Sequence, residues 1–313
     1  MKAPKPKKQH WVSQFYLRQF AIPDTKNTKL PKVWAFSKDA GDPVIINVKD
    51  IAAKRYLYSP PDKAGCRNWA TEDKLGDLES LLSQIWPVFA DSFNDFYENE
   101  SFRKIMALFV ATLYLRNPYQ ISSVEMAHTH VVDTFSSLPK DEKGNPIVEA
   151  VMYEDQIRTF DPSGFTQYSV RSKTELQHDF VAYINTMAVS VAEILLEKRW
   201  SIIFSEDSQF ITSDKPVVVI NKNKEKFGLK TEGTIIMFPI SSSRLLVLDD
   251  RYNEPKGQYY PLSSDGPGPH NLLIWREALN FMISPRHTDE VCEEMLSWAD
   301  IYDQNSSLDF LSR

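Results

Sequence analysis

The chain has 313 residues, a formal net charge of -6 at pH 7 and a hydrophobic content of 42%. A chain of this length can bury a large core, as one big domain or as two closely packed ones. Its net charge argues against a broad basic surface for duplex nucleic acid. Cys66 and Cys292 lack Cys-x-x-Cys spacing, which argues against a disulfide framework or a zinc knuckle and favours a reduced, cytoplasmic location.

The first expected element is a short aromatic helix. Ser13 is a good N-cap, and residues 14–20 then make about two helical turns. Large apolar side chains surround this segment, and each can contribute ~1.5–3 kcal/mol on burial. They are Trp11, Phe15, Tyr16, Leu17 and Phe20. Such anchors would fix His10, Gln14 and Arg18 in space.

Periodicity predicts the remaining elements in chain order. Short β-rich runs at 33–36 and 44–48 flank a turn and predict a hairpin. Helical patterns follow, and their expected ranges are 71–86, 101–116, 121–135 and 173–199. Alternating patterns then predict strands at 200–204, 210–212, 217–220, 235–238 and 245–248. A plain loop at 263–269 precedes closing helices at 271–281 and 288–299.

This order predicts an α+β fold, with a mixed or antiparallel sheet joined to a subdomain of several long helices. We expect an N-terminal motif helix and β-hairpin over residues 1–60, a helical subdomain over 61–199, and a β-rich C-terminal part with closing helices over 200–313. The first and last regions are expected to pack as one domain. The most apolar run, 105–115, covers about half of a membrane crossing, so we expect a buried helix there and no membrane partner.

Three motifs carry a family resemblance. Residues 9–20 read Gln-His-Trp-Val-Ser-Gln-Phe-Tyr-Leu-Arg-Gln-Phe, residues 210–216 read Phe-Ile-Thr-Ser-Asp-Lys-Pro, and residues 114–118 read Tyr-Leu-Arg-Asn-Pro. These motifs resemble those of the bacterial and fungal family catalogued as domain of unknown function 4238. Trp11 stands where that family usually has Tyr, and Ser13 where it usually has Pro. The resemblance implies kinship more than an activity, and bacterial members of such orphan families often look like accessory or defence genes.

Two of the motifs supply a candidate catalytic pair, His10 and Asp214. A histidine can act as general acid or base near neutral pH. Asp214 follows Thr212 and Ser213 at the end of an apolar strand, just before Pro216. In the functional interpretation Asp214 orients or deprotonates a group held near His10. In the structural alternative it closes a β-turn.

The candidate substrate-binding residues are polar groups from the same motifs. Gln14 and Arg18 are four residues apart and share one helix face, so an amide and a guanidinium can together hold an anionic group such as phosphate. Arg116 is either a helix C-terminal cap or an anion ligand in a cleft. Thr212 and Ser213 complete the set.

These residues predict a hydrolase or nuclease that acts on a phosphodiester of RNA or a nucleotide. His10 and Asp214 would perform the chemistry, while Gln14 and the two arginines would stabilise negative charge. The sequence lacks Gly-x-Gly-x-x-Gly, Walker and Gly-x-Ser-x-Gly motifs, which excludes nucleotide-driven motors and α/β-hydrolases. No obligatory cofactor is expected.

Two alternatives remain open. In the first, the protein is a non-catalytic binding or sensor module whose motifs are a structural lock, and whose helical subdomain recognises another protein or a small signal molecule. In the second, it is a Mg²⁺-dependent nuclease that uses Glu72, Glu79 and Asp214 as oxygen ligands.

Overall fold

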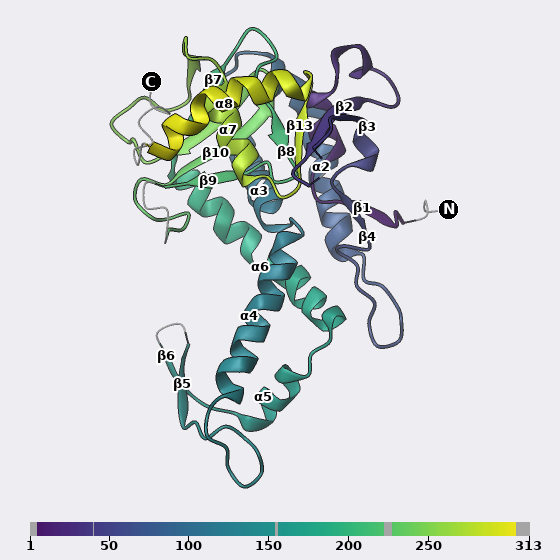
Figure 1. The fold of residues 1–313 in the computed structure, drawn as a ribbon, viewed down its shortest axis with the longest axis vertical. Helices are drawn as coiled ribbons and strands as arrows, with labels where there is room; N and C mark the ends of the chain where they lie inside the picture. The colour runs from purple at the N-terminus through teal and green to yellow at the C-terminus, as the bar shows by residue number, and fades with distance from the viewer. Residues whose placement is uncertain (1–4, 40, 154–155, 222–226, 305–313) are drawn as a thin grey trace.

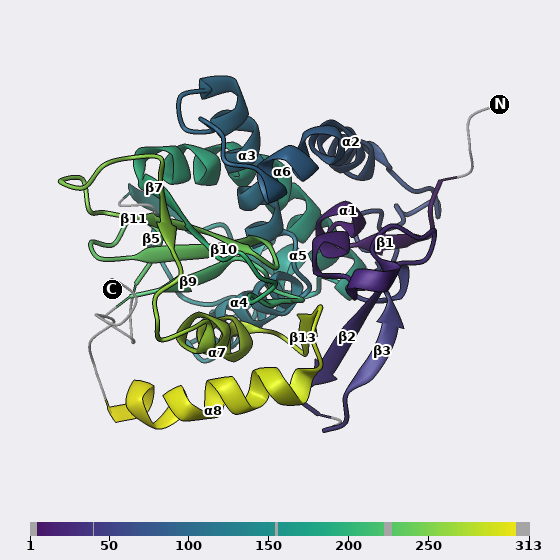
Figure 2. The same ribbon diagram turned by 90° about the horizontal axis from the view of Figure 1, so that it is seen from above.

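A computed structural model describes residues 5–39, 41–153, 156–221 and 227–304 of the chain. The fold is α+β, as the order of the elements predicts. A five-stranded sheet lies between two groups of helices (Figure 2). A largely helical arm projects away from this layered body (Figure 1).

The central sheet is built from the C-terminal part of the chain. Its order is β12-β7-β11-β10-β9, and all pairs are antiparallel except the parallel pair of β12 and β7. The strands are β7 Arg199–Phe204, β9 Val218–Ile220, β10 Ile235–Ser241, β11 Arg244–Asp249 and β12 Gln258–Pro261. Successive side chains of a strand point to opposite faces of the sheet. Each of the two groups of helices therefore packs on every second residue of these strands.

A second sheet joins the two ends of the chain, in the order β3-β2-β13-β8. Its strands are β2 Lys32–Ser37, β3 Val44–Asn47, β8 Thr212–Ser213 and β13 Phe281–Ser284. The predicted N-terminal hairpin is present and pairs with the later strand β13. The short strands β1 Lys8–His10 and β4 Ala53–Arg55 pair beside it.

The larger core lies between the central sheet and the helices α2 Ala70–Asp91, α3 Glu100–Leu115 and α6 Lys173–Glu197 (Figure 2). Trp86 and Phe109 pack edge to face at its centre, with ring centroids 5.3 Å apart, and both meet Phe238 of β10. The run 105–115 is thus a core helix, as predicted. By length and composition, α6 could cross a membrane, but in this fold it packs on α3 and α4.

The arm consists of α4 Tyr119–Ser136, α5 Pro162–Ser169, the hairpin of β5 Ala150–Tyr153 and β6 Gln156–Thr159, and the first part of α6 (Figure 1). Phe135, Phe160 and Phe165 form a small aromatic cluster of its own. The polar loop at 139–146 connects α4 to β5 and belongs to this arm.

On the opposite face of the central sheet lie α7 Gly268–Glu277 and α8 Thr288–Gln304 (Figure 2). They enclose a second, smaller core that includes Met237, Leu245 and Leu273. A Cβ at position 268 would lie 2.6 Å from the Trp298 ring, so glycine allows the start of α7 to approach α8 closely.

The five strands predicted after residue 200 are present with small shifts, but they divide between two sheets. The helix expected over 271–281 is wrong at its end, because α7 stops at Glu277 and Phe281 begins β13. The backbone N–H groups of Leu279 and Asn280 bind the Asp214 carboxylate instead of continuing the helix. Residues 56–58 form a turn after β4, and Tyr56 has a φ of 55°.

Candidate functional site

The aromatic N-terminal segment is anchored in the core. Gln14–Leu17 form α1 and Arg18–Phe20 a 3₁₀ turn. Tyr16 is fully buried, stacks on Phe238 at 5.1 Å, and shares a hydrogen bond of 2.7 Å with the Thr212 hydroxyl. The Trp11 indole N–H donates to the main-chain oxygen of Asp214 at 2.8 Å. The N-terminal motif and the 210–216 motif therefore meet in space.

His10 lies at the edge of this meeting point. Its Nε2 is 3.1 Å from the main-chain oxygen of Lys49, and its Nδ1 is 3.5 Å from the Gln14 amide nitrogen. A carbonyl oxygen only accepts, so Nε2 carries the proton and the Nδ1 lone pair faces Gln14. Partial burial lowers the pKa of His10, which favours the neutral imidazole.

The Asp214 carboxylate faces the chain just before β13. Oδ1 accepts from the backbone N–H groups of Leu279 at 2.9 Å and Asn280 at 3.1 Å, and Oδ2 accepts from the Asn280 backbone and side-chain amides. Burial raises the pKa of Asp214, and these donors lower it by a smaller amount. His10 and Asp214 thus bind different partners, and their segments are connected through Trp11.

Arg116 follows α3 and is 1% exposed. Its Nε donates to the Trp11 carbonyl at 2.9 Å, while its two terminal nitrogens reach a Glu79 carboxylate oxygen and the Ser13 hydroxyl, both at 2.7 Å. Ser13 also donates to Glu79 at 2.8 Å. Ser13 is the N-cap residue of α1, as expected, but its hydroxyl makes no capping hydrogen bond to that helix. We call Ser13, Glu79, Arg116 and the Trp11 carbonyl the motif junction.

The other predicted binding residues form two groups, one fully buried and one at a pocket. Thr212 and Ser213 are fully buried, with Thr212 bonded to Tyr16 and the Ser213 hydroxyl accepting from the Lys215 N–H. Arg18 donates to the carbonyls of residues 26 and 28. Together with Gln14, it lines a pocket of about 240 Å³ that also includes Lys29 and Lys49. That pocket is basic and lies next to His10.

The three carboxylates of the magnesium alternative do not assemble into one ligand set. Glu79 binds Arg116, Asp214 binds the 279–280 backbone, and within the described part of the chain no three His, Cys, Asp or Glu side chains are placed to hold a metal ion. Burial, with the charge of Glu79 nearby, raises the pKa of Glu72 to about 7. Glu72 is thus an acid close to its midpoint at neutral pH.

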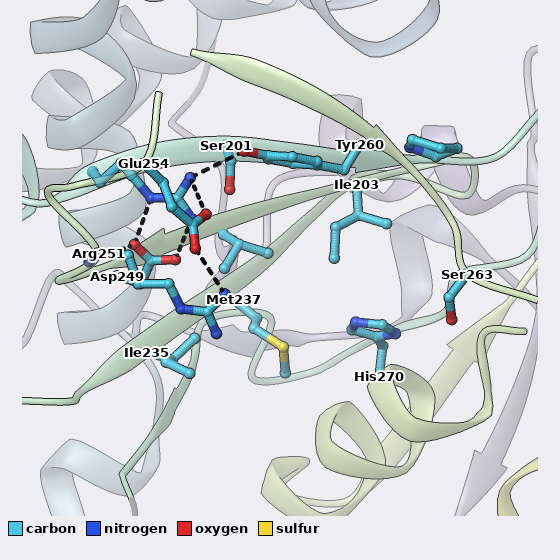
Figure 3. Close-up of a pocket in the computed structure, with 13 residues that line it drawn as sticks. Ser201, Ile203, Ile235, Met237, Asp249, Arg251, Glu254, Tyr260, Ser263 and His270 are labelled. Atoms are coloured by element: carbon cyan, nitrogen blue, oxygen red, sulfur yellow. Dashed lines mark hydrogen bonds and ion pairs between the residues drawn. The ribbon is translucent and has the colours of Figure 1, made fainter. Parts of the chain in front are cut away.

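A separate cavity of about 170 Å³ lies between the central sheet and the start of α7 (Figure 3). Strand alternation assembles its wall. Arg199, Ser201 and Ile203 are alternate residues of β7. Ser201 lies beside Val247 of β11, which lies beside Met237 of β10. The wall is therefore apolar in the middle and polar at one end.

The polar end is a closed charge network. Arg199 donates to both oxygens of Asp249, at 2.8 and 2.6 Å, and lies 3.2 Å from Glu254. Arg251 is 3.7 Å from the other Glu254 oxygen (Figure 3). Hydrogen bonding to Asp249 raises the pKa of Arg199. Two guanidiniums thus balance two carboxylates, which leaves this part of the wall without net charge.

His270 forms the opposite side of the cavity, in the first turn of α7 (Figure 3). It is 4% exposed, and neither ring nitrogen has a hydrogen-bond partner among the residues that the structure describes. Burial lowers its pKa to about 4, so the imidazole is neutral at physiological pH. A buried polar group without a partner is uncommon and costs stability. It therefore requires an explanation.

Sequence patterns alone did not select His270, because they assigned 263–269 to a plain loop. Two signals were nevertheless present. Pro267, Gly268 and Pro269 lead rigidly into a helix and place the next side chain in its first turn. Arg199 and Ser201 are polar and occupy alternate positions of an otherwise apolar strand. Their side chains therefore lie on the same face of the sheet, which indicates a polar region there.

Comparisons with known proteins place this geometry in a family. A family model described as "Protein of unknown function (DUF4238)" matches residues 8–300. The match includes all three motifs and confirms the resemblance that they carry. No curated protein and no solved structure matches the chain.

Proposed function

The chain belongs to the DUF4238 family of proteins of unknown function, and from the geometry of its cavity we propose that it is a binding or sensor module for a small molecule. The observation that carries this proposal is the buried His270 imidazole, which lines the cavity and whose two nitrogens bond to none of the described residues. A ligand that hydrogen-bonds His270 would remove the cost of that unpaired group.

The shape of the cavity supports the same function. Its inner surface is buried, with Ser201, Met237 and His270 each less than 5% exposed. Two other lining residues, Arg251 and Glu254, are charged and partly exposed. A mostly apolar pocket with a few directed polar groups is the usual form of a small-molecule site.

The motif junction supports a non-catalytic role for the motif residues. Arg116, Asp214 and Thr212 direct their polar atoms at other groups of the same chain. Such bonds hold the N-terminal segment and β8 in place and position the second sheet beside the cavity-bearing sheet. In this proposal the motifs are a structural lock.

The test is a fragment screen by ligand-observed NMR on the full chain, with Ser201→Leu as a variant that fills the cavity. We expect hits that bind the wild type and lose binding in Ser201→Leu. Ser190→Leu makes the same change on the exposed face of α6 and should keep every hit. Hits that bind both variants equally, or an absence of hits, would overturn the proposal.

The phosphodiester hydrolase remains a second candidate because of the basic pocket beside His10. Gln14, Arg18, Lys29 and Lys49 could hold a phosphate there while the neutral His10 imidazole accepts a proton.

Cleavage of a labelled RNA would be compared for wild type, His10→Ala and Gln14→Ala, with and without Mg²⁺. Magnesium-independent cleavage lost in His10→Ala would support this candidate, and cleavage lost on chelation would support the magnesium-dependent form. Equal, background-level cleavage by all three proteins would exclude both.

A further inference from the structure

The size of the His270 cavity limits its ligand to about one or two fused rings. Its volume is about 170 Å³. An engineered protein cavity of about 150 Å³ holds one benzene molecule, so a single ring or a compact bicyclic compound matches this space. A peptide, a dinucleotide or a long acyl chain would not fit within it.

The charges around the cavity favour an uncharged ligand. Arg199 is already paired with Asp249 on two oxygens, and Glu254 stands between Arg199 and Arg251. An anionic ligand would gain no unpaired cation in the buried wall, and a cationic one would gain no unpaired carboxylate. Burying an unpaired charge costs far more than burying a neutral polar group.

The remaining polar groups of the wall can both donate and accept hydrogen bonds. A neutral imidazole has one N–H and one lone pair, so His270 donates from one nitrogen and accepts at the other. The hydroxyls of Ser201 and Ser263 have the same double capacity. A ligand edge that carries a donor next to an acceptor can therefore match this wall whichever His270 tautomer is present.

Between these polar groups the wall is apolar. Ile203 of β7 and Met237 of β10 are labelled in Figure 3. With Val247 of β11, the strand between them, they offer a surface without hydrogen-bonding side chains. A flat ring can lie against such a surface while its edge points to His270. Methionine adds a polarizable sulfur, which contacts aromatic rings favourably.

From these four features together we infer that the cavity binds an uncharged heterocycle of the nucleobase type, with its hydrogen-bonding edge toward His270 and one face on Met237. This inference rests on the proposed function, since it names the ligand class of the same cavity. It assigns the role of ligand-binding residue to His270, Ser201 and Ser263.

The experiment measures binding of three kinds of ring to the full chain by isothermal titration. Adenine, cytosine and uracil represent uncharged heterocycles, toluene an apolar ring and benzoate an anionic ring. The variant His270→Phe replaces the imidazole by an apolar aromatic ring and so removes both nitrogens. The matched control is His130→Phe on the exposed face of α4.

We expect at least one of the three bases to bind the wild type and the His130→Phe control equally. The affinity of the same base for His270→Phe should be lower by a factor of about ten or more, because at least one buried hydrogen bond is lost. Base binding that His270→Phe leaves unchanged would overturn the inference. Toluene or benzoate binding without base binding would also overturn it, while leaving the proposed small-molecule function intact. An absence of binding by every ring, together with a fragment screen without hits, would reject both.

Discussion

The motif junction and the His270 cavity both bury polar groups, but they treat those groups in opposite ways. At the junction, Arg116 donates to Trp11, Ser13 and Glu79. In the cavity, both nitrogens of His270 are buried without a partner. The motif residues Arg116, Asp214 and Thr212 are therefore paired within the chain. Gln19 and Asn117 of the motifs each have one buried oxygen without a partner among the described residues. In His270 both ring nitrogens lack such a partner, and this side chain lines a cavity.

This difference distinguishes polar groups that stabilise the fold from polar groups that can bind a ligand. A buried polar group that is fully bonded stabilises one conformation and has little left to offer a substrate. A buried polar group without a partner reduces stability and persists where another molecule can pair with it. Each region therefore predicts a different response to substitution, to pH and to ligand.

The largest expected effect is at the junction. Arg116→Met should lower the free energy of unfolding by about 3–5 kcal/mol, because the Trp11 carbonyl loses its donor and the partly buried Glu79 carboxylate loses its charged partner. Urea denaturation followed by circular dichroism measures this change. Arg55→Met, on the exposed strand β4, is the control and should change stability little. An Arg116→Met protein as stable as this control would show that the junction is not a lock.

The acid response of His270 is the next largest effect. Its pKa lies at about 4 in the folded chain, against an ordinary value of 6.5, so the unfolded chain binds one more proton between these values. Stability should therefore be complete above pH 6.5 and fall by up to about 3 kcal/mol as the pH drops to 4.

In His270→Phe this part of the acid-induced loss should disappear. Urea titrations at several pH values would measure it, with His130→Phe as the matched control. If wild type and His270→Phe lose the same stability on acidification, His270 is not a buried neutral group, and the contrast between the two regions fails.

A smaller effect should appear where the two motifs touch. Tyr16→Phe removes the hydroxyl that bonds Thr212 and should cost about 1 kcal/mol, since it leaves the buried Thr212 oxygen unpaired. The double variant Tyr16→Phe/Thr212→Val should lose less stability than the sum of the losses in the two single variants. A double-mutant cycle in urea measures this coupling. Strict additivity would mean that this bond does not join the motifs.

The smallest effect concerns Glu72, whose charge is poorly compensated near the junction. Its pKa is raised to about 7 from 4.5, so the folded chain holds its proton more tightly and stability falls as the pH rises through this window. Glu72→Gln should be more stable than wild type by about 1 kcal/mol at pH 8, after allowance for solvent screening, and equal to it at pH 4. Thermal unfolding at both pH values tests this difference.

Much of the fold could be predicted because it depends on local patterns. The apolar spacing along 101–116 and 173–199 is enough to specify α3 and α6, and alternation marks β7, β10 and β11. The errors occur where a distant partner overrides a local preference. The helix expected over 271–281 ends early because the Asp214 carboxylate, more than sixty residues away, binds the backbone at 279–280.

The candidate site was less predictable for the same reason. The sequence correctly indicated that the aromatic residues around His10 are anchors, because burial follows from side-chain chemistry. It could not indicate that Arg116 binds Glu79, or that the His270 nitrogens have no partner in the described part of the chain. Hydrogen-bond partners depend on which segments the fold brings together. The division into regions 1–60, 61–199 and 200–313 remains a prediction.

By itself, therefore, the sequence determined the family, the α+β class and the position of most helices and strands, since periodicity and motif identity are properties of neighbouring residues. Only the tertiary structure decided which polar side chains are satisfied and which remain open to a ligand. The physical reason is that a side chain's hydrogen-bonding capacity belongs to its residue type, whereas its satisfaction depends on atoms that the folded chain brings from far away in the sequence.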